Sequence, residues 1–411
     1  MAGRSINMSR LKLQLDPTAR HNYRIDAIAS VLFSMFNVVF NQFYIPMAIR
    51  EGATNLQVGL LAAAPAIGLL FSPLWAAQIE RSNPKPYMII PNLIGRALIL
   101  LPAFFGVPLV YVAAALVFQI LMGIQAPAYA AMITRVYPAK HRGKLMANVR
   151  IMMGALMIPM AFLVGSWMDV SGPSGPLMVA SITGVISILV FSKLREGGGT
   201  EPVPAPAAKR ASLREQMTVI KQNRELGIFL LATFFSGFGN ILANPLYQII
   251  QVDRLQLSNL EIGYARATYY ACLLISYFVI GWVIDRFSAK HTMVYGIAAF
   301  AVVPMLYAFF GNYSAVLVGS GIQGIGDAIW DIGILAYVFR LAPGREAVVF
   351  GLHLMLFGIR GTIAPILSTV LVDSVSLTVL LTSASIIGWI GVLVFVLGGR
   401  AGSRSGLLEP R

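Results

Sequence analysis

Four ionisable residues fall inside two long apolar runs near the C-terminus, and their types and spacing suit proton transfer. Asp327 and Asp331 are four residues apart, so they share one face of a helix, as His353 and Arg360 do seven apart on the next. At a rise of about 1.5 Å per residue, Asp327 comes level with Arg360, and Asp331 with His353. We therefore predict two ion pairs. Either they form a site that takes up and releases protons, since both acids and the histidine can titrate, or they are permanently neutralised structural pairs.

Two more charged residues near or inside apolar runs each allow two interpretations. Asp26 lies at the start of the first run, where it is either an acid embedded in the membrane or a solvated residue at a helix start. Arg266 lies beside Tyr264, Tyr269 and Tyr270. It can attract an anionic substrate, or it can extend outward to the interface and pair with Glu261.

Amide side chains also occur within the apolar runs. Asn37 and Asn41 share a helical face by spacing, as do Asn240 and Asn244. Amides at such positions either hydrogen-bond a substrate or bridge helices. Aromatic side chains can wall a binding site, although lipid-facing aromatics are as common. The candidate binding residues are Arg360, Arg266, Asn37, Asn41, Gln119, Gln125, Asn240, Asn244, Tyr269 and Trp330.

The composition requires an apolar solvent. Of 411 residues, 57% are hydrophobic and 12% charged, with mean hydropathy +0.74, more apolar surface than a soluble domain can bury. The net charge of +14 sits in short basic loops without an aromatic stripe, so we expect no nucleic-acid partner. The single cysteine, Cys272, excludes an internal disulfide. The first 24 residues lack an apolar core, so we expect no cleavable signal peptide.

Twelve runs are long enough to cross a bilayer as helices, which predicts an all-α membrane protein with twelve transmembrane helices. Two pairs of runs are barely separated, which implies tight hairpins. The runs are 25–49, 56–79, 86–106, 109–134, 146–167, 175–193, 225–250, 259–284, 291–311, 314–339, 347–371 and 375–398.

The basic residues orient these helices. With the N-terminus inside, the inner segments carry 26 lysines and arginines, and the outer loops carry only Arg50 and Arg254. The positive-inside rule therefore places both termini in the cytoplasm, with a tail at 1–24 and another at 399–411.

The chain repeats itself in two halves, 25–193 and 225–398. Thr54-Asn55-Leu56-Gln57 recurs as Ser258-Asn259-Leu260-Glu261, and both copies are typical capping boxes that open a helix. The spacing between equivalent motifs is 204 to 206 residues, which favours duplication. Between the halves, the segment 194–224 is rich in glycine and proline, so we expect a mobile cytoplasmic linker with a surface helix at 212–221.

Two loops carry a shared motif. Gly281-Trp282-Val283-Ile284-Asp285-Arg286 continues to Lys290, and a weaker copy runs from Glu80-Arg81 to Lys85 without the glycine. The pattern resembles the signature loop of major facilitator superfamily (MFS) transporters, and the resemblance covers residues 25–398. It implies two six-helix repeats and a gate that latches the halves together on the cytoplasmic side. The gate residues would be Glu80, Arg81, Lys85, Gly281, Asp285, Arg286 and Lys290; the alternative is a basic loop that only fixes orientation.

Further residues are compared with the superfamily's patterns. Its drug exporters often carry a membrane-embedded acid where Asp26 stands, which makes Asp26 a candidate for proton coupling. The position of Arg96 is more often peripheral in this fold, so we expect Arg96 to bind a helix end or a lipid. Two departures argue against drug/proton antiport. Gln119 stands where proton antiporters usually carry arginine, and Ile158-Pro159 replaces their Gly-Pro pair.

We therefore expect a secondary active transporter of the cell (inner) membrane that works by alternating access, with proton-coupled efflux of an amphiphilic small molecule. The alternatives are uptake or facilitated transport of an organic anion or polar metabolite, and a membrane sensor or lipid-handling protein that transports nothing. No P-loop, H-E-x-x-H or G-x-S-x-G occurs, so we expect neither an enzyme nor a cofactor or metal site. The expected partners are the substrate, protons and membrane lipids, and the protein is expected to be a monomer.

Overall fold

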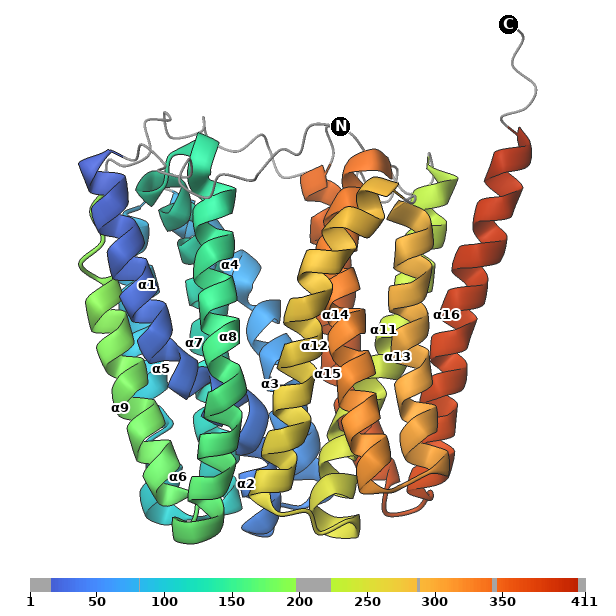
Figure 1. Ribbon diagram of the computed structural model, residues 1–411, viewed down its shortest axis with the longest axis horizontal. Coiled ribbons are helices and arrows are strands. Elements are labelled where there is room, and N and C mark those ends of the chain that lie inside the picture. The colour runs from blue at the N-terminus through green and yellow to red at the C-terminus, as the bar shows by residue number, and fades with distance from the viewer. Residues whose placement is uncertain (1–15, 81, 197–222, 287–288, 342–345, 406–411) are drawn as a thin grey trace, which may run out of the picture.

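The computed structural model describes residues 16–80, 82–196, 223–286, 289–341 and 346–405, and every regular element within them is helical (Figure 1). We call residues 16–196 the first half and 223–405 the second half. The first half contains α1 (Pro17–Val38), η2 (Val39–Phe43), α2 (Tyr44–Arg50), α3 (Asn55–Leu70), α4 (Ser72–Glu80), α5 (Pro84–Leu98), α6 (Leu101–Phe105), α7 (Pro108–Val136), α8 (Ala139–Ser171) and α9 (Ser174–Phe191).

The second half contains α11 (Arg224–Ile249), η3 (Ile250–Arg254), α12 (Asn259–Arg286), α13 (Ala289–Phe309), α14 (Tyr313–Leu341), α15 (Glu346–Leu371) and α16 (Leu377–Ser405). Nine helical segments in the described ranges are long and apolar enough to cross a membrane. The other three predicted ranges are occupied by α3 with α4, by α12 and by α14. The all-α membrane architecture is confirmed, and the count of twelve spans stays a prediction.

Most helix ends follow from local sequence. Both predicted capping boxes form: the Gln57 N–H donates to the Thr54 hydroxyl over 3.3 Å, and the Glu261 N–H to the Ser258 hydroxyl over 3.1 Å. The two tight hairpins turn at Gly106 and Gly311, whose positive φ angles of 41° and 49° favour glycine.

Two predicted boundaries were wrong. α1 begins at Pro17, eight residues before the predicted start, because the Asp16 carboxylate accepts the Thr18 N–H over 2.6 Å and caps the helix there. The predicted second helix is broken at Phe71, where Pro73 has no N–H to continue the ladder. The predicted surface helix at 212–221 and most of the linker lie outside the described residues.

The two halves lie side by side in Figure 1, with α1–α9 on the left and α11–α16 on the right. The described ends of the chain lie at one end of the molecule, which we call the termini end; we call the opposite end the far end. Two helix pairs make the main contacts between the halves, α8 with α12 and α3 with α15. Glycines let these helices approach: a Cβ on Gly59 would lie 2.1 Å from the Thr369 hydroxyl, and one on Gly263 would lie 2.6 Å from the Ala161 carbonyl oxygen.

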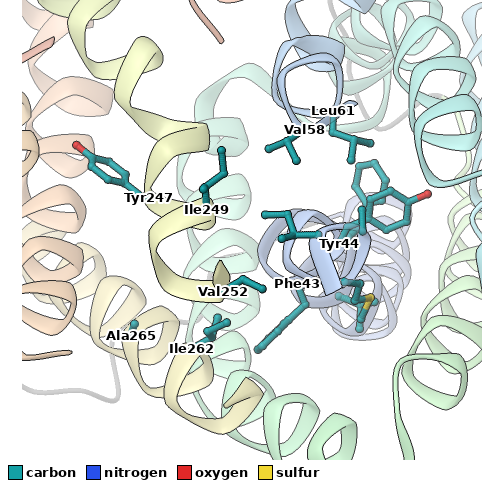
Figure 2. Close-up of a cluster of buried hydrophobic side chains, with 14 of the residues drawn as sticks. Phe43, Tyr44, Val58, Leu61, Tyr247, Ile249, Val252, Ile262 and Ala265 are labelled. Atoms are coloured by element: carbon teal, nitrogen blue, oxygen red, sulfur yellow. The ribbon is translucent and has the colours of Figure 1, made fainter. Parts of the chain in front are cut away.

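Among the described residues, the apolar core joins the halves toward the far end. Its largest cluster takes Phe43 and Leu61 from the first half and Ile249 and Ile262 from the second (Figure 2). Toward the termini end the core divides into two main clusters, one within each half, the first around Tyr137 and the second built from α11, α13, α14, α15 and α16. The molecule is therefore packed shut at the far end.

Two carboxylates fasten the far end, and we call these contacts the far-end latches. Asp169, at the end of α8, accepts the backbone N–H groups of Asn259 and Leu260 at the start of α12, over 2.8 and 2.9 Å, and the Asn259 side-chain amide over 2.8 Å. Asp373, just after α15, accepts the side-chain amide of Asn55 at the start of α3 over 2.6 Å. Asn259 and Asp373 follow Asn55 and Asp169 by 204 residues each. The latches are therefore equivalent positions of the sequence repeat.

The Asp169 latch should be the stronger of the two. Asp169→Asn removes a charge at the N-terminus of α12 and one acceptor oxygen, which should weaken far-end closure by about 1 to 2 kcal/mol. We expect a roughly 5- to 30-fold larger population with separated far ends. Spin labels on Phe105→Cys and Phe310→Cys in a Cys272→Ser background measure this as a longer distance component by pulsed electron resonance.

Asp373→Asn should produce a smaller shift, since Asp373 accepts one side-chain amide rather than two backbone N–H groups. Glu51→Gln is the matched control, because it changes an exposed acid at the same end whose neighbours lie in its own half. Equal distance distributions in Asp169→Asn and Glu51→Gln would contradict the assignment of Asp169 as a latch.

Candidate functional site

A polar cavity of about 170 Å³ lies between the halves, and we call it the central cavity. Asn41 and Gln42 reach it from the first half. The second half surrounds it with α11, η3, α12, α13 and α14, which contribute Gln248, Arg266 and Asp327 among others. An acid, a base and several amides therefore face one space at the contact between the repeats.

Two π-helical turns carry amides into this cavity. Asn41 and Gln42 lie in η2, which interrupts the helix begun by α1, and Gln251 lies in η3, at the end of α11. A π-turn leaves part of the helical hydrogen-bond ladder displaced and often marks a functional site. Gln42 also joins the halves directly, because its side-chain amide donates to the Tyr270 hydroxyl over 2.7 Å.

Asp327 is held in the central cavity by neutral donors. The Tyr269 hydroxyl donates to one carboxylate oxygen over 2.8 Å, and the Gln323 amide donates to the other over 3.5 Å. Among the described residues no lysine, arginine or histidine forms an ion pair with Asp327, so no cation neutralises it there. A carboxylate with such partners can gain or lose a proton without breaking an ion pair.

Arg266 lies in the same cavity and is bound by amides. Its Nη2 donates to the side-chain oxygens of Gln248 over 2.8 Å and Gln251 over 3.2 Å. Its Nε is buried and has no hydrogen-bond partner in the described structure. The Gln251 amide in turn donates to the Tyr307 hydroxyl over 3.0 Å. The predicted pairing of Arg266 with Glu261 does not form, because the Glu261 carboxylate is bonded within its capping box to Ser258.

Both predicted ion pairs between the tenth and eleventh helices were wrong. Asp327 faces Tyr269 on α12, and Arg360 donates instead to the backbone carbonyl of Thr233 on α11. Asp331 is exposed and accepts the Tyr277 hydroxyl over 2.6 Å. His353 is buried beside Trp330, with ring centroids 5.4 Å apart, and its Nδ1 has no partner in the described residues.

The reason is the packing direction of the helices. α14 packs mainly on α12 and α13, and α15 packs mainly on α3 and α11, so the two helices barely touch. Matching residues by depth gives their height in the membrane but not the direction in which they point. Arg360 also packs against Gly237 of α11, where a Cβ would lie 2.4 Å from its guanidinium, so the lack of a side chain at Gly237 makes room for it.

The predicted amides are spread over several environments. Asn41 accepts nothing from the second half; its side-chain amide donates to Asn37 over 2.8 Å. Asn41, Gln119 and Asn244 line a second cavity of about 270 Å³ between η2, α2, α3, α7, α11 and α15, which we call the amide cavity. The Oδ1 atom of Asn240 is buried without a partner among the described residues.

Asp26 and Gln125 line a third cavity of about 270 Å³ inside the first half, which we call the first-half cavity. Asp26 is 5% exposed and lies nine residues after the start of α1, so it is not a solvated residue at the helix start. Its carboxylate accepts the Tyr137 hydroxyl over 2.7 Å. Arg96 also lines this cavity; it is buried and donates to Gly184 and Ser187 within α9, so the expected binding to a helix end was wrong.

The predicted gate motif is described only in part. Arg81 lies outside the described residues, as do the side chains of Glu80 and Asp285. Gly281 is described only as part of the backbone of α12. Lys85 donates from Nζ to the Leu194 carbonyl over 3.1 Å, which ties α5 to the end of the first half. Arg286 ends α12, and Lys290 follows in the first turn of α13. The gate role of all seven residues stays a prediction.

Several residues of the central cavity were absent from the predicted set. Gln251 and Gln323 bond to Tyr307 and Asp327, and Gln42 crosses to Tyr270. Two of these carry a signal in the sequence. Gln251 follows Gln248 by three residues, and Gln323 precedes Asp327 by four, so each shares a helical face with a polar neighbour.

Double-mutant cycles should separate the observed partner of Asp327 from the predicted one. We expect Tyr269→Phe and Asp327→Asn to be coupled by about 1.5 to 3 kcal/mol in the free energy of unfolding, because they share a hydrogen bond to a charged group. Arg360→Gln and Asp327→Asn should instead be additive, within about 0.5 kcal/mol. Denaturation of the purified protein with sodium dodecyl sulfate measures the three single variants, the two double variants and the wild type. Strong coupling of Asp327 to Arg360 without coupling to Tyr269 would restore the ion pair.

The sequence also matches known proteins. A sequence profile described as Major Facilitator Superfamily matches residues 27–241 and 229–407. The chain is 28% identical over 137 residues to the tetracenomycin C resistance and export protein of Streptomyces glaucescens, a stretch that is 33% of this chain and only 24% of that protein.

Solved structures share the fold. The nucleoside transporter NupG superposes with a TM-score of 0.70 at 14% identity, covering 92% of this chain and 98% of that one. A bacterial homologue of the human lysosomal transporter Spinster, in an inward-facing and unoccupied conformation, gives 0.65 at 12% identity, covering 93% and 96%. At these identities the likeness shows the fold alone. With the profile spanning most of its length, the chain belongs to the major facilitator superfamily and is a membrane transporter rather than an enzyme.

Proposed function

We propose that this transporter exports an amphiphilic small molecule by alternating access, in exchange for protons that bind Asp327. The central cavity lies on the substrate path in this proposal. The family supports membrane transport, and the chemistry of the cavity supports the coupling.

The observation that carries the proposal is the environment of Asp327. Its carboxylate faces a cavity between the halves and is bonded to Tyr269 and Gln323 rather than to a cation. A charged carboxylate inside a membrane-spanning helix is costly, and binding a proton removes the charge. Tyr269 and Gln323 can both hydrogen-bond the protonated acid as well, so proton uptake leaves the site intact.

The distribution of contacts supports alternating access. The apolar core and the latches at Asp169 and Asp373 close the far end, and the main core clusters nearer the termini end lie within separate halves. We propose that the motif residues Asp285 and Arg286, with Glu80 and Arg81, close the termini end in the opposite state. We also propose that the termini end faces the cytoplasm in a cell (inner) membrane, which the basic loops support, and that the working unit is a monomer surrounded by lipid.

The direction and the substrate rest on one relative. The Streptomyces glaucescens protein is named for resistance to and export of tetracenomycin C, which supports export as the direction here. Arg266 favours a second candidate function, transport of an organic anion or polar metabolite, because its guanidinium faces the central cavity and no acid neutralises it among the described residues.

Proteoliposomes distinguish the two functions. Vesicles with the purified full chain and an acidic interior should accumulate ethidium or tetracenomycin C against a gradient. Because the proposal requires proton uptake by Asp327, Asp327→Asn should lower this accumulation about 100-fold. The variant should retain exchange of labelled for unlabelled probe at equal pH. Asp331→Asn is the matched control, because Asp331 lies one turn away on the same helix, outside the central cavity.

The alternative gives a different pattern. If 1-naphthylacetate moves without a pH gradient and Arg266→Gln stops it, anion transport replaces proton-linked export. Gradient-driven accumulation that survives Asp327→Asn would overturn the role of Asp327.

A further inference from the structure

The proposed transport through the central cavity does not involve the first-half cavity. All its lining residues belong to α1, α5, α7, α8 and α9, so it lies within one repeat rather than between the two. At about 270 Å³ it is larger than the central cavity. Its polar residues are of both signs, with Asp26, Arg96 and Arg150 among them.

Arg96 is the residue that most needs an explanation. It lies 12 residues after the start of α5, a depth of about 18 Å at 1.5 Å per residue, close to mid-membrane. It is 8% exposed and donates through Nη1 to the Gly184 carbonyl over 2.7 Å and to the Ser187 hydroxyl over 3.0 Å. Its Nε is buried with no partner in the described structure. Phe33 lies against the guanidinium, with 4.4 Å from its carbon to the ring centroid.

The cavity holds an excess of positive charge. Neither Arg96 nor Arg150 forms an ion pair among the described residues, and the one acid in the lining, Asp26, is bonded to the Tyr137 hydroxyl. An arginine in apolar surroundings without a counter-charge is costly, and such residues mark binding sites and ion paths by default. A bound anion would supply the missing charge.

The rest of the lining is apolar and adaptable. Four methionines, Met88, Met122, Met146 and Met153, face the cavity together with Phe33 and Phe118. Methionine side chains are flexible and polarisable, so they accommodate apolar groups of different shape. A cavity with an apolar wall and a few placed polar groups is typical of a small-molecule site.

We propose that the first-half cavity binds an amphiphilic organic anion, whose acidic group meets Arg96 and Arg150 and whose apolar body lies on the methionine and phenylalanine wall. The site is separate from the central cavity and does not depend on proton coupling at Asp327. The anion is either a soluble aromatic or aliphatic acid or a fatty acid from the bilayer, which share this chemistry.

Three probes of one shape test the charge requirement: 1-naphthylacetate, 1-naphthylacetamide and 1-naphthylmethylamine. Isothermal titration of the full chain in lipid nanodiscs should show binding of the acetate, at least tenfold weaker binding of the amide and none of the amine. Displacement of the acetate by dodecanoate assigns the site to lipid-derived acids as well. Binding of the acetate without that displacement assigns it to soluble acids. Equal affinities of the three naphthyl compounds would overturn the proposal.

Variants place the binding in this cavity. Arg150→Gln should weaken the acetate about tenfold, and Arg150 is exposed enough to change without harm to the fold. Ser30→Phe should abolish binding by filling the cavity without touching an arginine. Arg96→Gln should also abolish binding of the acetate, and size-exclusion chromatography checks that this variant folds. Arg135→Gln, a basic residue outside the cavity, is the control. Unchanged affinity in both Ser30→Phe and Arg150→Gln would exclude the site.

Discussion

A protein in a bilayer must satisfy its polar groups from within, because the lipid offers no hydrogen bonds. This constraint explains the partners seen in the structure. Arg96 and Arg360 donate to backbone carbonyls of neighbouring helices, and Arg266 donates to two glutamines. Asp26 and Asp327 accept tyrosine hydroxyls. The hydrogen bonds satisfy these groups without neutralising their charges. The two acids can therefore still bind a proton, and the arginines can still bind an anion.

The same constraint made much of the fold predictable. A helix must satisfy its own backbone, so long apolar runs could only be helices, and the capping boxes at Thr54 and Ser258 marked two starts correctly. The hairpins at Gly106 and Gly311 followed from the short gaps between runs. The family was identified from the loop around Asp285 and is confirmed by the match along the chain.

The site was less predictable because periodicity gives the face of a helix but not the neighbour that it meets. Asp327, Arg266 and Tyr269 were among the predicted candidates and share a cavity, while their roles stay predictions. The pairing of Asp327 with Arg360 failed because α14 and α15, although consecutive, pack against other helices. The burial of Arg96 was missed for a related reason: its partners, Gly184 and Ser187, lie about 90 residues away and have no special pattern.

The two far-end latches are reciprocal contacts between the halves. Asp169 of the first repeat binds the second repeat, and Asp373 of the second binds the first, at positions 204 residues apart in both cases. Such reciprocity is the defining property of an isologous dimer interface, where residue i meets j and j meets i. Two identical copies of a half-length chain would make both contacts with a single acid and a single helix start. The latches therefore repeat, within one polypeptide, the reciprocal contacts that two half-length chains would make in a homodimer.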